Sequence, residues 1–486
     1  MKKILLTFLF ALGIFGLAAC GGETSSKAPA KKKTVIQYCG WDLGSESEPT
    51  LKRKMIEEFN KNSETIIIDM LPSADPLEDF LNTLASNGSL PDVFLIDSVP
   101  TAVMKEWALD ITSYTQADSE WNDVDASLRN SITYNDSVFA LPAAQNYVGL
   151  FANYDLIDQY AYIDGDAKDV FAPGAATFTT DALFEVIPQI KDIKTDGSSV
   201  IGINAVGDMI NWLPSVIDQE GKFEHFVWDG EKFDFTGPVM IEALTKIQSL
   251  GKIASKNTFN SYADYTAEED PRIGLFGNND ASPVFLAGQI GFYQGMTSDD
   301  VSSIKFDYKF VGYSDQRVVS AGDFLCISKA CKNPEAAYEV ARYLAFSAEG
   351  VQARYKIVDE NPKIKLSGLP VNNNSQVTEK WFDYVEMKGV KEVYDKVVSG
   401  EMELIIEGLK TVPGFKNARY TKDTGIKFDE VRGGATLSIG DLIWDVCEGS
   451  IGIGQYTAAM TEEKAALLNK EVTDAMAKIK EVQAKK

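Results

Sequence analysis

The stretch that decides the fold class is residues 91–98, which read PDVFLIDS. Its centre, Val93–Ile96, is a continuous apolar run, as is typical of a strand covered on both faces of a parallel sheet. On its N-terminal side strand and helix patterns alternate, with strands at Thr34–Tyr38 and Ile66–Met70 and helices over 51–59 and 77–85. This alternation predicts an α/β fold with right-handed crossovers.

The alternation continues along the chain. Strand patterns recur at Val138–Leu141, Val148–Phe151 and Gln289–Phe292, and helical patterns at Asp181–Lys191, Pro238–Leu250 and Asn333–Phe346. The last of these helices has Asn333 as a candidate N-cap and Pro334 at its first position. Beyond Glu379 the pattern is mostly helical, with helices predicted over 379–399, 438–448 and 461–484.

The composition excludes several classes of protein. Of 486 residues, 45% are hydrophobic, which suits a well-cored chain of two or three domains. The net charge of −24, from 47 basic and 71 acidic residues, argues against binding to nucleic acid. His225 is the single histidine, which excludes multi-histidine metal sites, and no GxSxG elbow accompanies it to support a Ser-His-Asp triad.

The N-terminus indicates export. Lys2 and Lys3 precede an apolar run over 4–16 that is too short to cross a bilayer, so residues 1–19 are predicted to be a signal peptide. The following Leu-Ala-Ala-Cys resembles a bacterial lipobox, in which Cys20 is lipidated and becomes the mature N-terminus. Residues 20–33 are then a lipidated N-terminus and a flexible tether.

Four further cysteines remain after Cys20. Export permits disulfides, but Cys39 and Cys326 lie in apolar strand-like runs and Cys447 lies on a predicted helix. Isolated cysteines in such places are more often small buried hydrophobic residues. We therefore expect Cys39, Cys326, Cys331 and Cys447 to be free thiols.

Several motifs, taken in order, resemble the extracellular solute-binding proteins of bacterial ABC importers. The resemblance is to the carbohydrate-binding family that includes maltose-binding protein. The motifs cover nearly all of the mature chain and read TVIQYCGWD, KRKMIEEFNK, PDVFLIDS, FALPAAQNYVGLFANYDLID, FLAGQIGFYQGM, VVSAGDFLCISKACKNPEAAYEVARYLAF and GLPVNN. Each motif is weak alone, whereas the ordered set with a lipobox is specific.

The resemblance implies a two-lobed α/β fold of the periplasmic-binding-protein type (type II), with discontinuous lobes that close on a ligand. One lobe would comprise 34–144 plus 322–368, and the other 145–320 plus 369–486, with the helical C-terminal end docked mainly on the second lobe. The implied function is capture of a sugar and its delivery to an ABC permease. The protein would be a monomer without cofactor or catalytic residues, anchored by lipid to the outer face of the bacterial cell membrane.

Candidate ligand contacts in the first lobe follow the strand ends, because α/β sheets bind ligands beyond the carboxyl ends of their strands. Trp41 and Asp42 follow the first strand, and Asp97 and Ser98 end the PDVFLIDS strand, where a solvated or helix-capping pair is the alternative. A sugar site needs aromatic platforms together with carboxylates and amides that bond hydroxyl groups.

The resemblance implies further contacts at the first crossover and in the second lobe. At the crossover, Asn146 replaces an acidic residue of maltose-binding protein, which argues against maltodextrin, and Tyr147 could stack unless strand alternation points it away. The remaining candidate contacts are Asn211, Trp212, Tyr293, Gln294 and Asp323.

Three other features favour structural roles. Trp444 falls inside a helical pattern with Leu442 and Val446 and is expected in the core. His225 lies among aromatic residues and is expected to be a packed histidine. The segment Asp164-Gly165-Asp166 with Asp169 has Lys168 where a calcium loop needs an oxygen ligand, so no metal is expected.

Two other functions stay open. A secreted glycan-active enzyme would use two nearby carboxylates, but no catalytic motif is recognisable among the 71 acidic residues. A related binding protein could instead take a polyamine, a peptide or another polar solute, and Asp42, Asp97 and Asp323 are compatible with a polyamine. An anion is disfavoured because no basic residue stands at the candidate contacts.

Overall fold

The computed structural model describes residues 32–74, 76–190, 192–193, 199–218, 220–254, 285–366, 368–429 and 433–485. The predicted signal peptide, Cys20 and most of the tether lie outside the described residues. Within the described ranges, no helix combines the length and the apolar character that a membrane span requires.

The described strands form one large mixed sheet and two small hairpin sheets, with the order β2-β1-β3-β11-β6-β9-β8-β7 along the large one. The strands are β1 (Thr34–Cys39), β2 (Ile66–Leu71), β3 (Val93–Ile96), β4 (Thr133–Tyr134), β5 (Ser137–Val138), β6 (Leu141–Asn153), β7 (Asp192–Ile193), β8 (Ser199–Ile203), β9 (Ile290–Met296), β10 (Tyr308–Gly312), β11 (Arg317–Ile327), β12 (Glu403–Ile406), β13 (Asp423–Lys427) and β14 (Thr436–Ser438).

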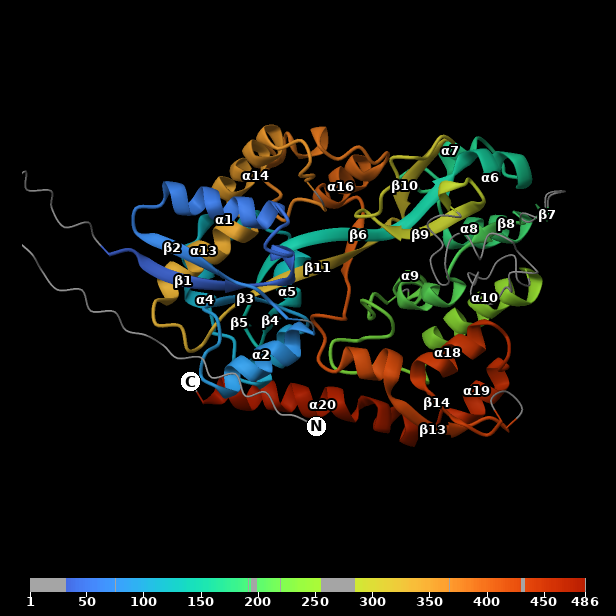
Figure 1. Ribbon diagram of the computed structural model, residues 1–486. Coiled ribbons are helices and arrows are strands. Elements are labelled where there is room, and N and C mark those ends of the chain that lie inside the picture. Colours follow the sequence, from blue (N-terminus) through green and yellow to red (C-terminus); the bar gives the residue numbers. More distant parts are fainter. Residues whose placement is uncertain are drawn as a thin grey trace, which may run out of the picture.

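The longer helices cover the two faces of this sheet (Figure 1). They are α1 (Leu51–Asn62), α2 (Leu77–Ser86), α10 (Pro238–Ala254), α13 (Pro334–Ala345), α14 (Ala348–Glu360), α16 (Val390–Val398), α18 (Ile439–Cys447) and α20 (Glu462–Ala484). Shorter helices are α3 (Val99–Met104), α4 (Thr112–Ala117), α5 (Ala126–Ser131), α6 (Tyr154–Tyr160), α7 (Ala167–Val170), α8 (Thr180–Val186), α9 (Leu213–Ile217), α15 (Ser375–Thr378) and α19 (Ile453–Ala459), with single turns η1 (Trp41–Leu43), η2 (Ser119–Asp123), η3 (Ile187–Gln189), η4 (Val206–Asn211), η6 (Trp381–Asp383) and the π-helical η7 (Asn417–Thr421).

The predicted α/β class is confirmed, although the sheet is mixed rather than parallel throughout. Strand β1 pairs in parallel with β2 and β3, as the sequence predicts, and these strands form the first lobe. The second lobe is built around β8, β9 and β10. Two long antiparallel strands, β6 and β11, run through both lobes and join them (Figure 1).

Two predicted helices differ from the structure. The helix predicted over 379–399 begins only at Val390, after Gly389, whose positive φ of 88° breaks the preceding turn. The mostly helical pattern predicted beyond Glu379 also misses β12, β13 and β14. Helix α13 begins at Pro334 as predicted, but the Asn333 side chain makes no capping hydrogen bond.

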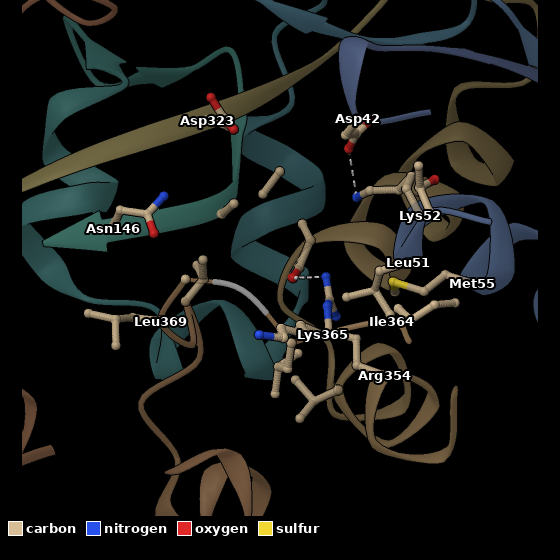
Figure 2. A pocket seen from close by; sticks show the side chains of 18 of the residues that line it. Asp42, Leu51, Lys52, Met55, Asn146, Asp323, Arg354, Ile364, Lys365 and Leu369 are labelled. Atoms are coloured by element: carbon tan, nitrogen blue, oxygen red, sulfur yellow. Dashed lines mark hydrogen bonds and ion pairs between the residues drawn. The ribbon is translucent and has the colours of Figure 1, made fainter. Parts of the chain in front are cut away.

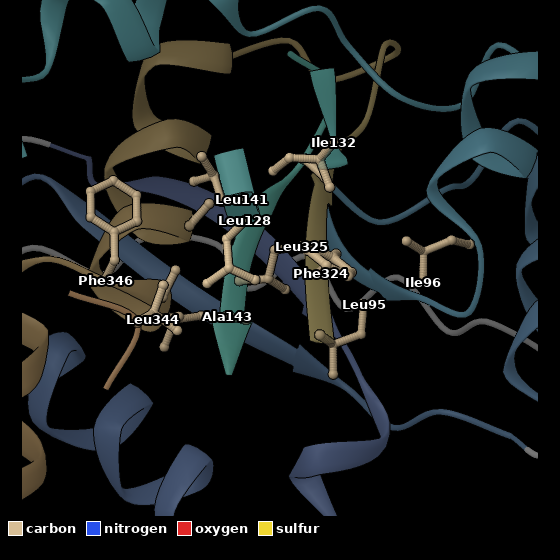
Figure 3. Packing of buried hydrophobic residues seen from close by; sticks show 14 of the residues in the cluster. Leu95, Ile96, Leu128, Ile132, Leu141, Ala143, Phe324, Leu325, Leu344 and Phe346 are labelled. Carbon is tan, nitrogen blue, oxygen red and sulfur yellow. The ribbon is translucent and has the colours of Figure 1, made fainter. Parts of the chain in front are cut away.

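Within the described ranges, the buried hydrophobic residues form two large clusters and one small one. Figure 3 shows part of the first cluster, with Leu95, Leu141 and Leu325 on three adjacent strands and Leu344 and Phe346 to one side of them. The second cluster fills the other lobe around Phe292, Leu442 and Val446. Cys39, Cys326 and Cys447 are buried, and these three and Cys331 are free thiols, as expected.

Helix α20 lies beneath both lobes rather than mainly on the second (Figure 1). Val472 packs in the second cluster, whereas Ile479 belongs to the first. Near its end, Gln483 donates to the Tyr134 carbonyl and accepts from Asn135 Nδ2 at 2.6 Å. Most of the C-terminal helices thus pack on the second lobe, and the last two turns of α20 contact the first.

Candidate functional site

The floor of the candidate site is the part of β6 and β11 that joins the lobes. Along β6 the partly exposed residues alternate with buried ones, and they are Ala144, Asn146 and Val148. Antiparallel pairing places Ala321 opposite Asn146 and Asp323 opposite Ala144. Since side chains alternate between the faces of a strand, these residues share one accessible face of the sheet.

The first cavity, of about 660 Å³, lies at the first-lobe end of this floor. Three predicted contacts line it: Asp42, Asn146 and Asp323 (Figure 2). Asp42 forms an ion pair of 3.3 Å with Lys52 and accepts a hydrogen bond of 2.6 Å from the Tyr38 hydroxyl. The Oδ1 atom of Asn146 is buried and has no hydrogen-bond donor.

A lysine that the sequence did not reveal stands beside Asp323. The Nζ atom of Lys410 lies 2.5 Å from Asp323 Oδ1 and 4.9 Å from the centre of the Trp41 ring. Trp41, a predicted contact, is half-buried next to this pair and is not among the described residues that line the first cavity. Lys52 and Lys410 thus correct the expectation that no basic residue stands at the candidate contacts, and they neutralise two acids that a polyamine would need.

The second cavity, of about 400 Å³, lies at the second-lobe end and is lined by Asn211, Trp212, Tyr293 and Gln294. The Trp212 ring stacks on Tyr313 with centroids 4.3 Å apart, and it is only 1% exposed. Its Nε1 atom donates to Gln294 Oε1 at 3.1 Å. The ring is therefore packed in the core of the second lobe, and stacking on a ligand, the role predicted for Trp212, is unsupported.

Gln294 positions Trp212 rather than offering free polar atoms. Its Oε1 atom accepts from Trp212, and its Nε2 atom donates to the carbonyls of Asn204 at 2.8 Å and Ala205 at 2.7 Å. Asn211 is similarly engaged, because its Oδ1 atom accepts from Arg419 Nε at 2.8 Å.

Both predicted tyrosine contacts point into the core. Tyr147 is 1% exposed and follows strand alternation away from the floor. Tyr293 contributes to the lining of the second cavity, but its ring stacks on Phe285 at 4.7 Å and its hydroxyl lies 3.2 Å from Asp299. Ring stacking on a ligand is therefore wrong as the role of Tyr147 and unsupported for Tyr293.

A third cavity, of about 750 Å³, is lined by Asp97 and Ser98 together with Lys410 and Phe415. Ser98 caps α3, since its Oγ atom accepts from the Thr101 amide at 3.3 Å. Asp97 is accessible to solvent, while the protein atoms that surround its carboxyl partly desolvate it and raise its pKa. The capping alternative therefore holds for Ser98, and Asp97 stays open to a ligand.

Sequence reasoning missed several residues that line the second cavity. Asp208, Tyr313 and Glu407 contribute side chains to it, and burial raises the pKa of both carboxyl groups. Glu407 directly follows β12, so the rule that ligands gather at strand ends could have identified it. The same rule covers Tyr313, which directly follows β10, whereas Asp208 lies in the short helix η4, for which no element is predicted from the sequence.

The residues expected to be structural are placed as follows. His225 is 4% exposed, stacks on Phe415 at 5.4 Å and accepts from the Gly408 amide at 3.3 Å, which confirms a packed histidine. Trp444 is half-buried rather than fully in the core and lies over Gly207. Asp166 caps α7, and among the described residues no group of three or more His, Cys, Asp or Glu side chains could hold a metal ion.

Solved structures with the same fold include three sugar-binding proteins or complexes. The ABC substrate-binding protein Lmo0181 from Listeria monocytogenes, in complex with cycloalternan, is 16% identical, with a TM-score of 0.60 over 90% of this chain and 99% of that one. MalE from Xanthomonas citri is 12% identical, with a TM-score of 0.62 over 93% of this chain and 100% of that one. A solute-binding protein from Thermotoga lettingae bound to α-D-tagatose is 15% identical, with a TM-score of 0.54 over 91% of this chain and 100% of that one.

These structures establish the two-lobed fold that the strand order and the joining strands indicate. A search of curated proteins found no significant match. A sequence model of one protein family, described as bacterial extracellular solute-binding protein, matches residues 54–389, which is more than half of the chain. The chain therefore belongs to the family of bacterial extracellular solute-binding proteins.

Proposed function

We propose that this protein is the substrate-binding lipoprotein of an ABC importer and that it captures a sugar or an oligosaccharide. The observation that carries the proposal is the floor of β6 and β11, with cavities at both ends that collect carboxylates, amides and an aromatic wall from distant parts of the chain. Structures of the same fold hold cycloalternan and α-D-tagatose, which supports a carbohydrate ligand here.

The proposed ligand contacts are the predicted residues whose side chains reach the cavities. Asp42, Asn146 and Asp323 would serve the first-lobe end, Asn211 the second-lobe end, and Asp97 the third cavity. Trp41 would join them beside Lys410. Hydroxyl groups can donate to these carboxylates and to the unpartnered Asn146 Oδ1, while the C–H face of a sugar can stack on an aromatic ring.

The proposed mechanism is capture by lobe closure without chemistry. The two lobes, 34–144 plus 322–368 and 145–320 plus 369–486, would close over the ligand by bending where β6 and β11 join them. A ligand shifts this equilibrium only through its higher affinity for the closed state. The closed monomer would then deliver the ligand to the permease, and neither a cofactor nor a catalytic residue takes part.

Export and anchoring complete the proposal. Cys20 would carry the lipid that holds the protein on the outer face of the cell membrane, and two or more acyl chains suffice for stable anchoring. Cys20→Ala should therefore release the protein from membranes. Recovery of an exported C20A protein in the membrane fraction would contradict the lipid anchor.

A thermal-shift screen of sugars, polyamines, amino acids and peptides tests the ligand class. At a hundredfold excess over Kd, a ligand adds about 2.7 kcal/mol to the free energy of unfolding. For 486 residues at ~2.1 cal/mol/K of unfolding entropy each, Tm should rise by about 3 °C. A sugar that shifts Tm and is recovered intact by chromatography supports the proposal. A response to peptides alone, or cleavage of the glycan, would replace it with another binding class or with an enzyme.

A further inference from the structure

Two carboxylates in the second cavity lack partners from the protein. Asp208 lies in η4 and is exposed, and Glu407 follows β12 and is half-buried. Among the described residues, no donor or cation lies within bonding distance of either carboxylate. The acids of the first cavity differ, because Asp42 and Asp323 are each paired with a lysine.

The charges around the second cavity leave an excess of one negative charge. Arg419 is the nearby cation; it is 4% exposed, donates to Asn211 and lies over the rings of Phe226 and Tyr420 at 5.0 and 4.6 Å. Lys410 is already paired with Asp323. Burial lowers the pKa of His225 to about 3, so this residue adds no charge at neutral pH. Two carboxylates thus face one guanidinium.

Two largely buried side chains of the same cavity each have one polar atom without a hydrogen bond to a described residue. Tyr313 is 3% exposed, lines the cavity beside Trp212, and its hydroxyl has no hydrogen bond to any described residue. His225 is 4% exposed; its Nδ1 atom accepts from Gly408, so its Nε2 atom carries the hydrogen, and no described acceptor meets it. Neither atom is fully enclosed by protein, so both polar atoms open into the cavity and are available to a polar ligand.

We propose that the ligand carries a protonated primary amine, which this cavity binds through Asp208 and Glu407. Closure over a neutral ligand would bury an uncompensated negative charge, which is costly in a low-dielectric site, whereas one ammonium group balances it. An ammonium group offers three donors for the two carboxylates and the Tyr313 oxygen, and the walls of Trp212, Tyr313 and Tyr420 favour a cation.

An amino sugar and a polyamine share this chemistry. We infer the amino sugar, since the inference rests on the proposed function. The hydroxyl groups of the sugar would reach the first cavity, where lysines already neutralise the acids. A polyamine would find no second unpaired acidic pair at that end, because Lys52 and Lys410 occupy Asp42 and Asp323.

Isothermal titration of the purified full-length protein at pH 7 tests the inference with ligands that differ only in the substituent at carbon 2 of each ring. The probes are the β-1,4 disaccharide of glucosamine, its N-acetylated form and cellobiose, which carry an ammonium, an acetamide and a hydroxyl at carbon 2, and spermidine. We expect the glucosamine disaccharide to bind at least tenfold more tightly than the other two disaccharides. Asp208→Asn and Glu407→Gln should each remove most of this preference, whereas Asp181→Asn, an exposed aspartate of the same lobe, should keep it.

The possible outcomes test the amine and the sugar separately. Equal binding of the three disaccharides, or a preference that survives in D208N and E407Q, overturns the amine while leaving sugar capture intact. Binding of spermidine alone, lost in the same variants, supports the amine and overturns the sugar. Absence of binding by both amines overturns the inference, and the sugar screen described above then judges the proposed function separately.

Discussion

The two cavities at the ends of the β6–β11 floor differ in how their charges are balanced. In the first, Lys52 pairs with Asp42 at 3.3 Å and Lys410 pairs with Asp323 at 2.5 Å. In the second, Asp208 and Glu407 line the wall without a partner among the described residues. A carboxylate that is paired with a lysine of the protein is held in place before any ligand binds. A carboxylate without such a partner is free to pair with a cationic group of the ligand. The charges of the first-lobe end are thus balanced without a ligand, whereas those of the second-lobe end are balanced only when a cationic ligand binds.

The aromatic residues at the two ends differ as well, and this gives the largest expected effect. Trp212 is 1% exposed and stacked on Tyr313, whereas Trp41 is half-buried next to Lys410. Trp212→Ala should lower the free energy of unfolding by about 3–5 kcal/mol, the usual cost of removing a buried tryptophan. Trp41→Ala should cost clearly less in the same urea titration. Equal stability of W212A and the unmodified protein would mean that the ring serves only the ligand.

Breaking the ion pair between Lys52 and Asp42 should have the next largest effect on the free energy of unfolding. Lys52 is 9% exposed and also donates to the Leu344 carbonyl at 3.0 Å. Lys52→Met keeps the apolar stem but leaves Asp42 uncompensated, which should cost about 3 kcal/mol of unfolding free energy. Lys54→Met removes an exposed pair with Glu57 and should cost less than about 1 kcal/mol. Similar losses in both variants would show that the first cavity is not preorganised by this pair.

The second cavity should respond to pH through His225. Its pKa is lowered by burial to about 3, while the unfolded chain protonates near its ordinary value of about 6.5. The unfolded state therefore binds the extra proton first, and between pH 7 and pH 5 the protein should lose about 2 kcal/mol of stability from this residue. His225→Gln should reduce that loss in chemical denaturation at the two pH values. Asp208 and Glu407, whose pKa values are raised, make the free energy of unfolding rise as the pH falls. They do so equally in the unmodified protein and in H225Q, so their contribution cancels when the two are compared.

Much of the fold follows from local sequence patterns, and the site follows only in part. Val93–Ile96 is predicted as a strand covered on both faces, because an apolar run has few other places in an α/β protein, and all four residues are buried. The strand ends also locate Asp42 and Asp97. The pairing of Asp323 with Lys410 joins residues 87 positions apart, and no pattern within either segment encodes that contact.

Strand alternation explains the errors at the tyrosines. Asn146 and Tyr147 are neighbours on β6, so only one of them can face the floor, and the accessible face is that of Asn146. On β9, Gln294 faces the cavity and Tyr293 packs behind it. A resemblance between sequences locates such a pair to within a residue, whereas the direction of each side chain depends on the register of the neighbouring strand.

The smallest expected effect is also the one that separates the two cavities most directly. Asp208→Asn and Glu407→Gln remove carboxylates that have no protein partner and whose pKa values are raised, so each should leave the free energy of unfolding at pH 7 unchanged within about 0.5 kcal/mol, or raise it. Asp42→Asn, which weakens a pair, should lower it by more than either. Urea unfolding of the three variants without ligand measures this contrast. A loss of 2 kcal/mol or more in E407Q would mean that a protein group completes this charge in solution, and the second cavity would then need no cation from its ligand.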